Sequence, residues 1–222
     1  MSKHNLLDTI IAQTKLSKKQ TDKQQKIVEM AIKMFAEKGY ANTSTNEIAK
    51  AAGVAEGTIF RHYGTKDNLL LSVILPFLKD SIPSIAEDVF NEIMTEDVGS
   101  FEDFLRALLK NRLNFIKENK EIFQIVVKEF LYKEELRNEL MPYFANNIGV
   151  RIINVIDMYK DRGELIDLPS STIQRLMFTF LGGYFVSRFV LLPDHKMMNE
   201  DEEIENVIRF VLDGIRNQSQ DK

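Results

Sequence analysis

The sequence predicts an all-α protein in which a small N-terminal three-helix domain precedes a C-terminal antiparallel helical bundle, with about nine to ten helices in all. Three observations support this fold class. Apolar residues recur at intervals of three and four over nearly the whole chain, which is the spacing of one helix face. No segment shows the sustained alternation of apolar and polar residues that a half-buried strand requires. Short groups of glycine, serine and proline separate the helical segments and mark their ends.

The first predicted helix covers residues 22–37. Ile27, Ala31 and Phe35 fall on one of its faces, which would pack against the core of the small domain. Gly39 follows this helix, and glycine readily adopts the left-handed conformation that ends many helices.

Two short helices follow. The Ser-Thr-Asn-Glu sequence at residues 44–47 is a capping box that starts the second helix, and Gly53 ends it. The third covers residues 56–63 and stops at Gly64. Two short helices joined by a tight turn and packed on a longer helix form a helix-turn-helix. Its second helix is short enough to enter the major groove of DNA, while the helix before it crosses the backbone.

Thr65 can cap a fourth helix over residues 66–78, in which Pro76 could localise a bend. Longer helical segments follow, and Ser100 and Asn199 are placed to cap two of them. These segments cover roughly residues 81–94, 101–118, 121–131, 133–162, 171–191 and 202–217.

The charge is unevenly distributed along the chain. Residues 1–66 contain 11 Lys and Arg against 6 Asp and Glu, a balance of +5, whereas the whole chain has a net charge of −4 and the remainder therefore −9. This distribution is typical of a chain in which only one end meets nucleic-acid phosphates. The absence of cysteine excludes disulfides and thiolate metal sites.

The composition favours a soluble cytoplasmic protein. Polar residues interrupt the apolar residues of segment 1–16, which does not resemble the core of a signal peptide. The most apolar stretch, 176–192, contains Arg188 and two glycines, so we expect no membrane span. We also expect no enzyme, cofactor or metal site, because the three histidines are scattered and no phosphate-binding glycine loop or nucleophile–base pair is present.

Four stretches of the N-terminal part carry a family resemblance. Ala-Glu-Lys-Gly-Tyr (36–40), Thr-Ser-Thr-Asn-Glu-Ile-Ala-Lys-Ala-Ala-Gly-Val (43–54), Gly-Thr-Ile-Phe-Arg-His-Tyr (57–63) and Lys-Asp-Asn-Leu (66–69) resemble the DNA-binding domain of TetR-family regulators. The resemblance covers about a fifth of the chain. It implies a helix-turn-helix domain at 21–68 and a ligand-binding and dimerisation domain at 69–222, after an N-terminal extension at 1–20.

The resemblance also implies roles for individual residues. A phosphate contact is implied for Thr45, close approach to the DNA for Gly57, groove contacts for Thr58, Phe60 and Arg61, and phosphate contacts for His62 and Lys66. The residues themselves agree with this, because Ile59 and Tyr63 take the inward face of the third helix. The predicted DNA-binding residues are Thr45, Glu56, Gly57, Thr58, Phe60, Arg61, His62 and Lys66.

Four of these predictions have alternatives. His62 either contacts a phosphate or is a surface residue near a helix end. Arg61 has the shape to bind guanine O6 and N7, or it contacts a phosphate or solvent instead. Phe60 either touches a thymine methyl group or packs beneath its own helix. Glu56 either accepts a hydrogen bond from cytosine N4 or stabilises the first turn of its helix.

The C-terminal part is rich in large apolar residues, most of which we expect in a plain core. A helical bundle of this composition can also hold an apolar ligand cavity. The candidate lining residues are Phe104, Leu108, Phe123, Val127, Phe130, Tyr143, Phe144 and Phe178. Polar groups such as Asn111 would set ligand specificity.

The last two predicted helices are candidates for a dimer interface. Gly182 and Gly183 lie in the middle of a predicted helix, where they either permit close approach of a second chain or form a packing notch within the chain. The candidate interface residues are Gly182, Phe185, Phe189, Val207, Phe210 and Val211.

These observations predict a ligand-responsive transcriptional repressor that acts as a homodimer on double-stranded, palindromic operator DNA. A small, apolar effector bound in the C-terminal bundle would release the operator. The alternative is a helix-turn-helix protein that a protein partner controls, or that acts without a small-molecule ligand. Residues 1–20 would form a disordered arm, a minor-groove arm or a docked helix.

Overall fold

The computed structural model describes residues 21–94, 99–192 and 199–215, with the side chains of 76–85, 135 and 139 left undescribed. Every regular element within these ranges is a helix, which confirms the predicted fold class. The predicted extension 1–20 and the last two residues of the predicted helix 202–217 lie outside the described residues.

The chain forms two compact units. The described part of the first unit contains residues 21–81 and 117–132, and it therefore extends beyond the expected domain 21–68. Its helices are α2 (Asp22–Lys38), α3 (Thr45–Ala52), α4 (Glu56–Tyr63), α5 (Lys66–Ile93) as far as Ser81, and α7 (Lys120–Tyr132).

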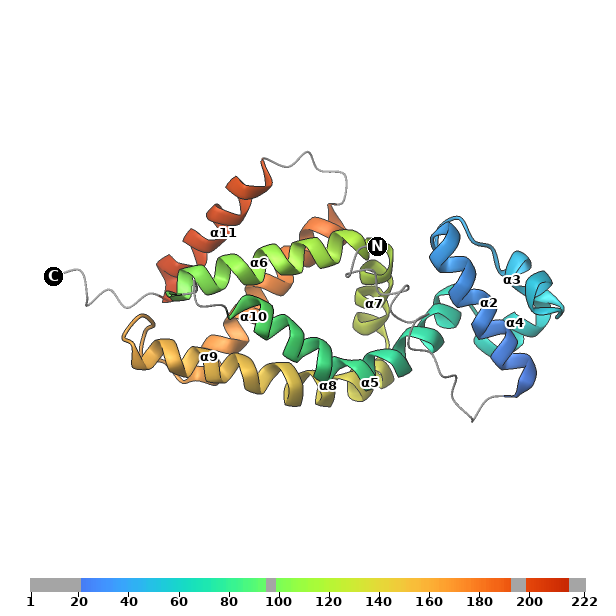
Figure 1. Ribbon diagram of the computed structural model, residues 1–222, viewed down its shortest axis with the longest axis horizontal. Helices are drawn as coiled ribbons and strands as arrows, with labels where there is room; N and C mark the ends of the chain where they lie inside the picture. The colour runs from blue at the N-terminus through green and yellow to red at the C-terminus, as the bar shows by residue number, and fades with distance from the viewer. Residues whose placement is uncertain (1–20, 95–98, 193–198, 216–222) are drawn as a thin grey trace. The chain divides into compact units, whose positions relative to one another are not determined.

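The core of the first unit fixes the positions of its short helices. Ile27 of α2, Ile48 of α3 and Ile59 of α4 are each at most 1% exposed, and α3 packs against both α2 and α4 (Figure 1). The predicted capping box of α3 is present, with Ser44 and Glu47 each accepting from the backbone N–H of the other. Gly53 ends α3 in the left-handed conformation, at φ 69°.

Helix α5 corrects the prediction of two separate helices at 66–78 and 81–94. It runs without interruption from Lys66 to Ile93, although it contains Pro76 and Pro83. Each proline removes one helical hydrogen bond. Buried residues on both sides of the expected break, Leu70 and Ile74 before it and Ala86 and Ile93 after it, hold the helix in place by packing. Tertiary packing here outweighs the local preference for a break.

The second unit contains the remaining helices. They are α6 (Phe101–Glu118, whose last two residues fall in the first unit), α8 (Glu134–Phe144), α9 (Val150–Asp161), α10 (Ser170–Val186) and α11 (Glu200–Ile215), with π-helical segments η1 (Ala145–Gly149) and η2 (Ser187–Leu191). The predicted helix 133–162 therefore appears as α8, η1 and α9 in succession. The predicted helix 171–191 appears as α10 and η2.

An aromatic cluster occupies the core of the second unit. The rings of Phe101 and Phe104 lie 5.4 and 6.3 Å from that of Tyr159, centroid to centroid, and all three side chains are at most 1% exposed. Helix α10 packs against α9. Ser100 caps α6 through Asp103, and the side chain of Asn199 accepts from the first turn of α11, so both predicted caps are confirmed. Among the described residues, no helix is long and apolar enough to cross a membrane.

Candidate nucleic-acid interface

Helix α4 presents a polar and aromatic face to its surroundings. Ile59 is buried at 1% exposure and Tyr63 is partly buried, as the sequence predicts. The opposite side carries Phe60, which is 48% exposed, and the exposed side chains of Arg61 and His62. The burial of Ile59 thus sets which residues of α4 can touch a partner.

Gly57 leaves open space on α4. A Cβ atom placed on Gly57 would have no neighbouring atom within 4 Å. Glycine within a helix is less favourable than alanine by about 1 kcal/mol. Packing inside the chain therefore gives no reason for glycine at this position, whereas close approach of an external backbone would give one.

Glu56 joins the beginnings of α3 and α4. Its carboxylate accepts a hydrogen bond of 2.6 Å from Thr45 Oγ1 and one of 3.1 Å from Asn46 Nδ2. These two hydrogen bonds lower the pKa of Glu56. Both hydrogen bonds link Glu56 to α3, and they engage the Thr45 hydroxyl within the chain, where the resemblance implies a phosphate contact.

Lys66 is held against the loop that precedes α3. Its Nζ donates to the carbonyl oxygens of Tyr40 at 2.8 Å and Thr43 at 2.9 Å, and it lies 4.0 Å from the centre of the Tyr40 ring. An ammonium group has three donors, so two are used within the chain. The positive charge of Lys66 thereby stays next to the start of α3.

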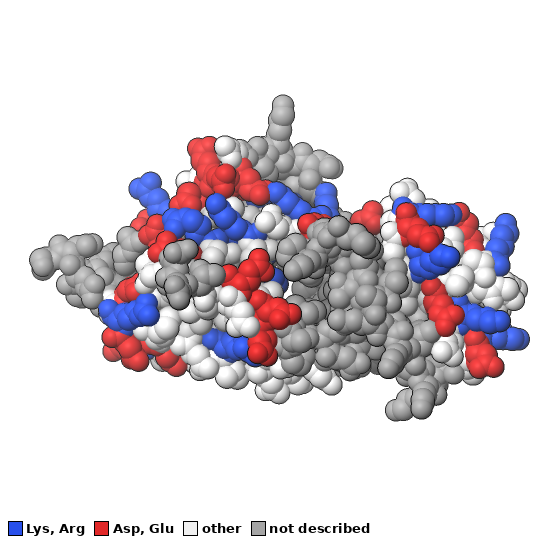
Figure 2. All heavy atoms as spheres, viewed as in Figure 1, with Lys and Arg blue, Asp and Glu red and all other residues white. Residues whose placement is uncertain are grey.

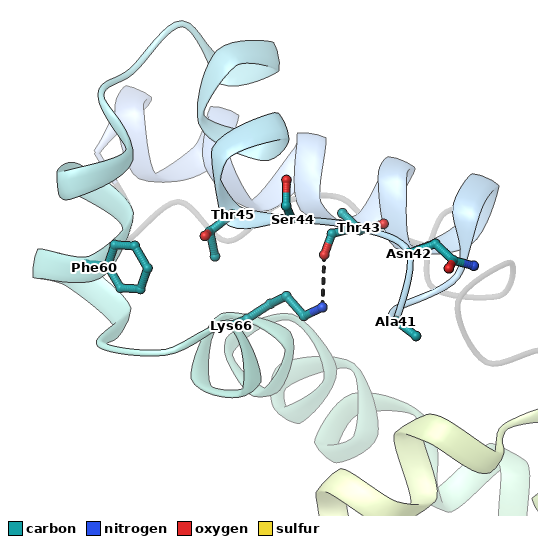
Figure 3. A pocket seen from close by; sticks show the side chains of 7 residues that line it. All are labelled: Ala41, Asn42, Thr43, Ser44, Thr45, Phe60 and Lys66. Carbon is teal, nitrogen blue, oxygen red and sulfur yellow. Dashed lines mark hydrogen bonds between the residues drawn. The ribbon is translucent and has the colours of Figure 1, made fainter.

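A shallow, open pocket of about 390 Å³ lies beside Lys66. Figure 3 shows the Phe60 ring from α4 on one side of it and the Lys66 side chain below the loop before α3. The pocket is lined by Ala41, Asn42, Thr43, Ser44, Thr45, Phe60 and Lys66. Hydroxyl groups and one ammonium group surround a small apolar surface, an arrangement that suits the oxygens of a phosphodiester and its adjoining sugar.

Side chains of α7 also contact the N-terminal helices, at the loop before α3 and at the start of α5. Glu121 accepts a hydrogen bond of 3.3 Å from the backbone N–H of Ala41. Asp67 accepts from the Tyr40 hydroxyl and lies 3.1 Å from Lys128 Nζ. Burial raises the pKa of Asp67, but the hydrogen bonds from Tyr40 and Lys128 outweigh it and hold that pKa below its usual value. Sequence reasoning missed these contacts, because they join residues 27 to 80 positions apart.

The basic excess of the N-terminal part is partly neutralised within the first unit. Lys38 of α2 forms an ion pair of 2.9 Å with Glu47, and Lys33 lies 4.0 Å from Glu37. Figure 2 shows acidic and basic side chains interspersed on the side in view. Exposed basic residues such as Arg61 therefore indicate where a nucleic acid could bind better than the net charge of the N-terminal part does.

A family comparison decides the identity of this domain. Residues 27–73, which include α3, α4 and the start of α5, match the family model of bacterial regulatory proteins of the tetR family. Residues 27–73 therefore carry a helix-turn-helix domain of the TetR-family type.

One curated relative and two solved structures are similar to larger parts of this chain. The HTH-type transcriptional regulator YerO of Bacillus subtilis is 31% identical over 140 residues, covering 57% of this chain and 48% of YerO. The match thus spans about half the length of this curated relative. A regulator from Saccharomonospora viridis, solved in complex with choline, has a TM-score of 0.58 at 18% identity and covers 90% of this chain and 100% of its own. FadR from Bacillus subtilis, solved in complex with stearoyl-CoA, has a TM-score of 0.55 at 18% identity and covers 86% and 98%. These structures share the fold.

The predicted ligand-lining residues are distributed over both units of the chain. Those at 123, 127 and 130 belong to the first unit, and the other five belong to the second. Phe104 is buried in the aromatic core, whereas Tyr143, Phe144 and Phe178 are 38%, 36% and 53% exposed. Leu108 is partly buried. Helical periodicity shows which residues share a face of one helix, but not which faces of different helices meet.

The predicted dimer residues differ in their exposure to solvent. Phe189, Val207 and Val211 are only 6 to 8% exposed within the single chain, because these side chains face its interior. Gly182 and Phe185 are partly exposed. Phe210 is 67% exposed and its ring stacks on that of Phe180 at 4.8 Å. Of the predicted set, Phe210 therefore marks the accessible face of α11.

Proposed function

We propose that this TetR-family protein is a ligand-responsive repressor whose dimer binds a palindromic operator. The observation that carries the proposal is the division of α4 into two faces. Ile59 anchors the helix in the core, while Thr58, Phe60, Arg61 and His62 remain on the outer side. In a helix-turn-helix, the outer face of the second helix reads the base edges in the major groove.

The phosphate contacts would come from the pocket beside α4. Lys66 supplies a fixed positive charge there, and Ser44 and Thr45 bring hydroxyl groups from the start of α3 (Figure 3). Phosphate contacts position a protein on the duplex without reading the sequence. Arg61 would add the specific contact, because its guanidinium group fits guanine O6 and N7.

The dimer would form through the outer face of α10 and α11. Leu176, Phe180 and Gly183 share one face of α10, and Phe210 of α11 lies against Phe180. Leu176 and Phe210 are 49% and 67% exposed. A Cβ atom on Gly182 or Gly183 would meet no atom within 4 Å, which argues against a packing notch within the chain and favours a partner chain. Because such a face pairs with a copy of itself, it suits a twofold dimer.

Ligand control is supported by the fold and by its solved neighbours. FadR of Bacillus subtilis binds stearoyl-CoA and the regulator of Saccharomonospora viridis binds choline, each as part of a chain of the same fold. Helix α5 carries the chain from the first unit to the second without a break. A ligand that displaces α5 would alter the separation of the two α4 helices in the dimer. Couplings of about 1–3 kcal/mol suffice to change the operator affinity 5- to 150-fold.

The test begins with a duplex selected from a random library by binding to the purified protein. Fluorescence anisotropy then gives the affinity between about 50 and 200 mM salt. We expect a steep fall in affinity with salt for the wild type and at least about tenfold weaker binding for Arg61→Ala. Arg162→Ala removes the same charge from the second unit and serves as the control. Equal affinities for the Arg61→Ala and Arg162→Ala variants would contradict the proposed role of α4.

A further inference from the structure

Helix α6 has two apolar faces of different burial. Leu105, Leu109 and Leu113 form one face and are at most 1% exposed. Leu108, Asn111, Arg112 and Phe115 form a second face and are partly accessible. This second face combines apolar side chains with an amide and a guanidinium group. Such a mixture is typical of sites that bind an apolar molecule with a polar end.

Arg112 contacts an amide and an aromatic ring on this face. Its Nε donates to Asn111 Oδ1 at 3.0 Å, and a terminal nitrogen donates to the same oxygen. The guanidinium carbon lies 5.2 Å from the centre of the Phe115 ring. Within the part of the chain that the structure describes, no carboxylate lies within 4.0 Å of the guanidinium group. Burial lowers the pKa of Arg112, and the more distant charge of Glu92 acts in the opposite direction.

Two other partly buried arginines of the second unit are neutralised by carboxylates. Arg106, on the same helix, lies 2.7 to 3.1 Å from the carboxylates of three acidic residues. Arg188 lies 2.5 Å from Glu203 and 3.2 Å from Glu200. A partly buried cation without a close counter-charge is unfavourable, since desolvation is not offset by an ion pair. Arg112 thus differs from the likewise partly buried Arg106 and Arg188.

We propose that Arg112, together with Asn111, binds the anionic group of an amphiphilic effector. The effector would be a molecule with an apolar chain and one carboxylate or phosphate group. Its anionic oxygens would accept from the remaining N–H groups of Arg112, and its chain would lie along Leu108 and Phe115. A guanidinium group binds both carboxylate and phosphate in a two-pronged geometry. This inference rests on the proposed function and specifies the charge of its effector.

The test compares four probes that share the same twelve-carbon chain. They are dodecanoate, dodecyl phosphate, dodecanol and dodecyltrimethylammonium, each titrated calorimetrically below its micelle concentration into the full-length protein. We expect at least one of the two anions to bind about tenfold or more tightly than dodecanol, and the cation to bind no better than dodecanol. The comparison of dodecanoate with dodecyl phosphate identifies which anion the site prefers.

Two variants test whether Arg112 is responsible for the tighter binding of the anionic probes. Arg112→Gln should abolish the difference between anion and alcohol, while Arg106→Gln should leave it unchanged. Without ligand, Arg112→Gln should melt at the same temperature as the wild type or higher, because it removes an uncompensated charge. A purely structural role for Arg112 would instead lower the melting temperature and leave the anion preference intact, and that result overturns the inference.

The proposed function and this inference fail in different ways. If dodecanol binds as tightly as the anions and releases the operator duplex, the protein is ligand-responsive and the assignment to Arg112 is wrong. If none of the four probes binds while operator binding is intact, an amphiphilic effector is excluded. Both the inference and the apolar-effector part of the proposed function are then contradicted, which favours control by a protein partner.

Discussion

At the scale of single residues, the clearest result concerns the charged groups around the start of α3. The sequence places Glu56 and Lys66 near the expected DNA surface, but their roles depend on neighbours distant in the chain. Glu56 accepts from Thr45 and Asn46, and Lys66 donates to the loop carbonyl of Tyr40. The inward position of Ile59 follows from helical spacing and was predicted. The hydrogen-bond partners were not, because spacing does not reveal which side chains meet across a turn.

Substitution of Gly57 should change the stability of the protein and its affinity for DNA in opposite directions. We predict that Gly57→Ala stabilises the protein by about 0.5–1 kcal/mol, because alanine loses less backbone entropy in a helix and no atom lies near the new methyl group. The same methyl group would obstruct close approach to DNA, so affinity for the selected duplex should fall. Urea unfolding and anisotropy measure the two effects. A variant with unchanged DNA affinity would show that the duplex does not approach Gly57.

Asp67 is predicted to stabilise the helix-turn-helix through the loop before α3. Asp67→Asn weakens the charged hydrogen bonds with Tyr40 and Lys128 and should reduce the free energy of unfolding by about 1–2 kcal/mol. Urea unfolding provides the measurement. Asp161→Asn, at an exposed position near the end of α9, is the matched control. Equal losses in the two variants would show that the Tyr40–Asp67–Lys128 contacts do not stabilise the fold.

At the scale of helices, short-range signals were reliable and long-range ones were not. The capping box at Ser44 and the stop at Gly53 act within a few residues, and both lie where the sequence predicts them. The continuity of α5 depends on packing on both sides of Ser81, which local composition does not report. The π-helical segments η1 and η2 also escaped prediction, since one additional residue per turn leaves little trace in the apolar pattern.

The cap of α3 should make stability depend on pH. Hydrogen bonds from the Ser44 backbone and from Lys38 lower the pKa of Glu47 from 4.5 to about 2. A lowered pKa in the folded state means that the ionised carboxylate stabilises the fold above pH 4.5, and that this contribution is lost as the pH falls towards 2. Glu47→Gln should therefore be less stable than the wild type near neutral pH, and the difference should shrink over this window.

Urea unfolding at a series of pH values measures this difference. Glu37→Gln, which changes an exposed carboxylate in the last turn of α2, is the control. A difference between wild type and Glu47→Gln that stays constant down to pH 2 would contradict the assigned role of the cap.

At the scale of the whole molecule, the central question is how two chains associate. The sequence indicated the last helices as the interface but assigned Val207 and Val211 to it, and both are buried within the chain. Helical spacing identifies one apolar stripe on α11, to which Val207 and Val211 belong, but it does not tell whether the same chain or a partner covers that stripe. Exposure does distinguish them, and it selects Leu176 and Phe210.

The proposed interface makes a prediction about assembly. A glutamate in place of Phe210 would place an unpaired charge in an apolar contact, so Phe210→Glu should convert the dimer to a monomer. Sedimentation equilibrium measures the molecular mass in solution. Val150→Glu alters another exposed apolar residue of the second unit, and this variant should remain dimeric. If Phe210→Glu is also dimeric, the interface lies elsewhere.

The claim that α4 of each subunit enters the major groove is tested most directly by methylation interference on the selected duplex. Methylation of guanine N7 blocks the major-groove edge that Arg61 is proposed to read. We predict two groups of interfering guanines, symmetrically placed and separated by about one helical turn of 10–10.5 base pairs or a multiple of it. Interference confined to adenine N3 in the minor groove, or absent at every guanine of the bound site, would contradict the account.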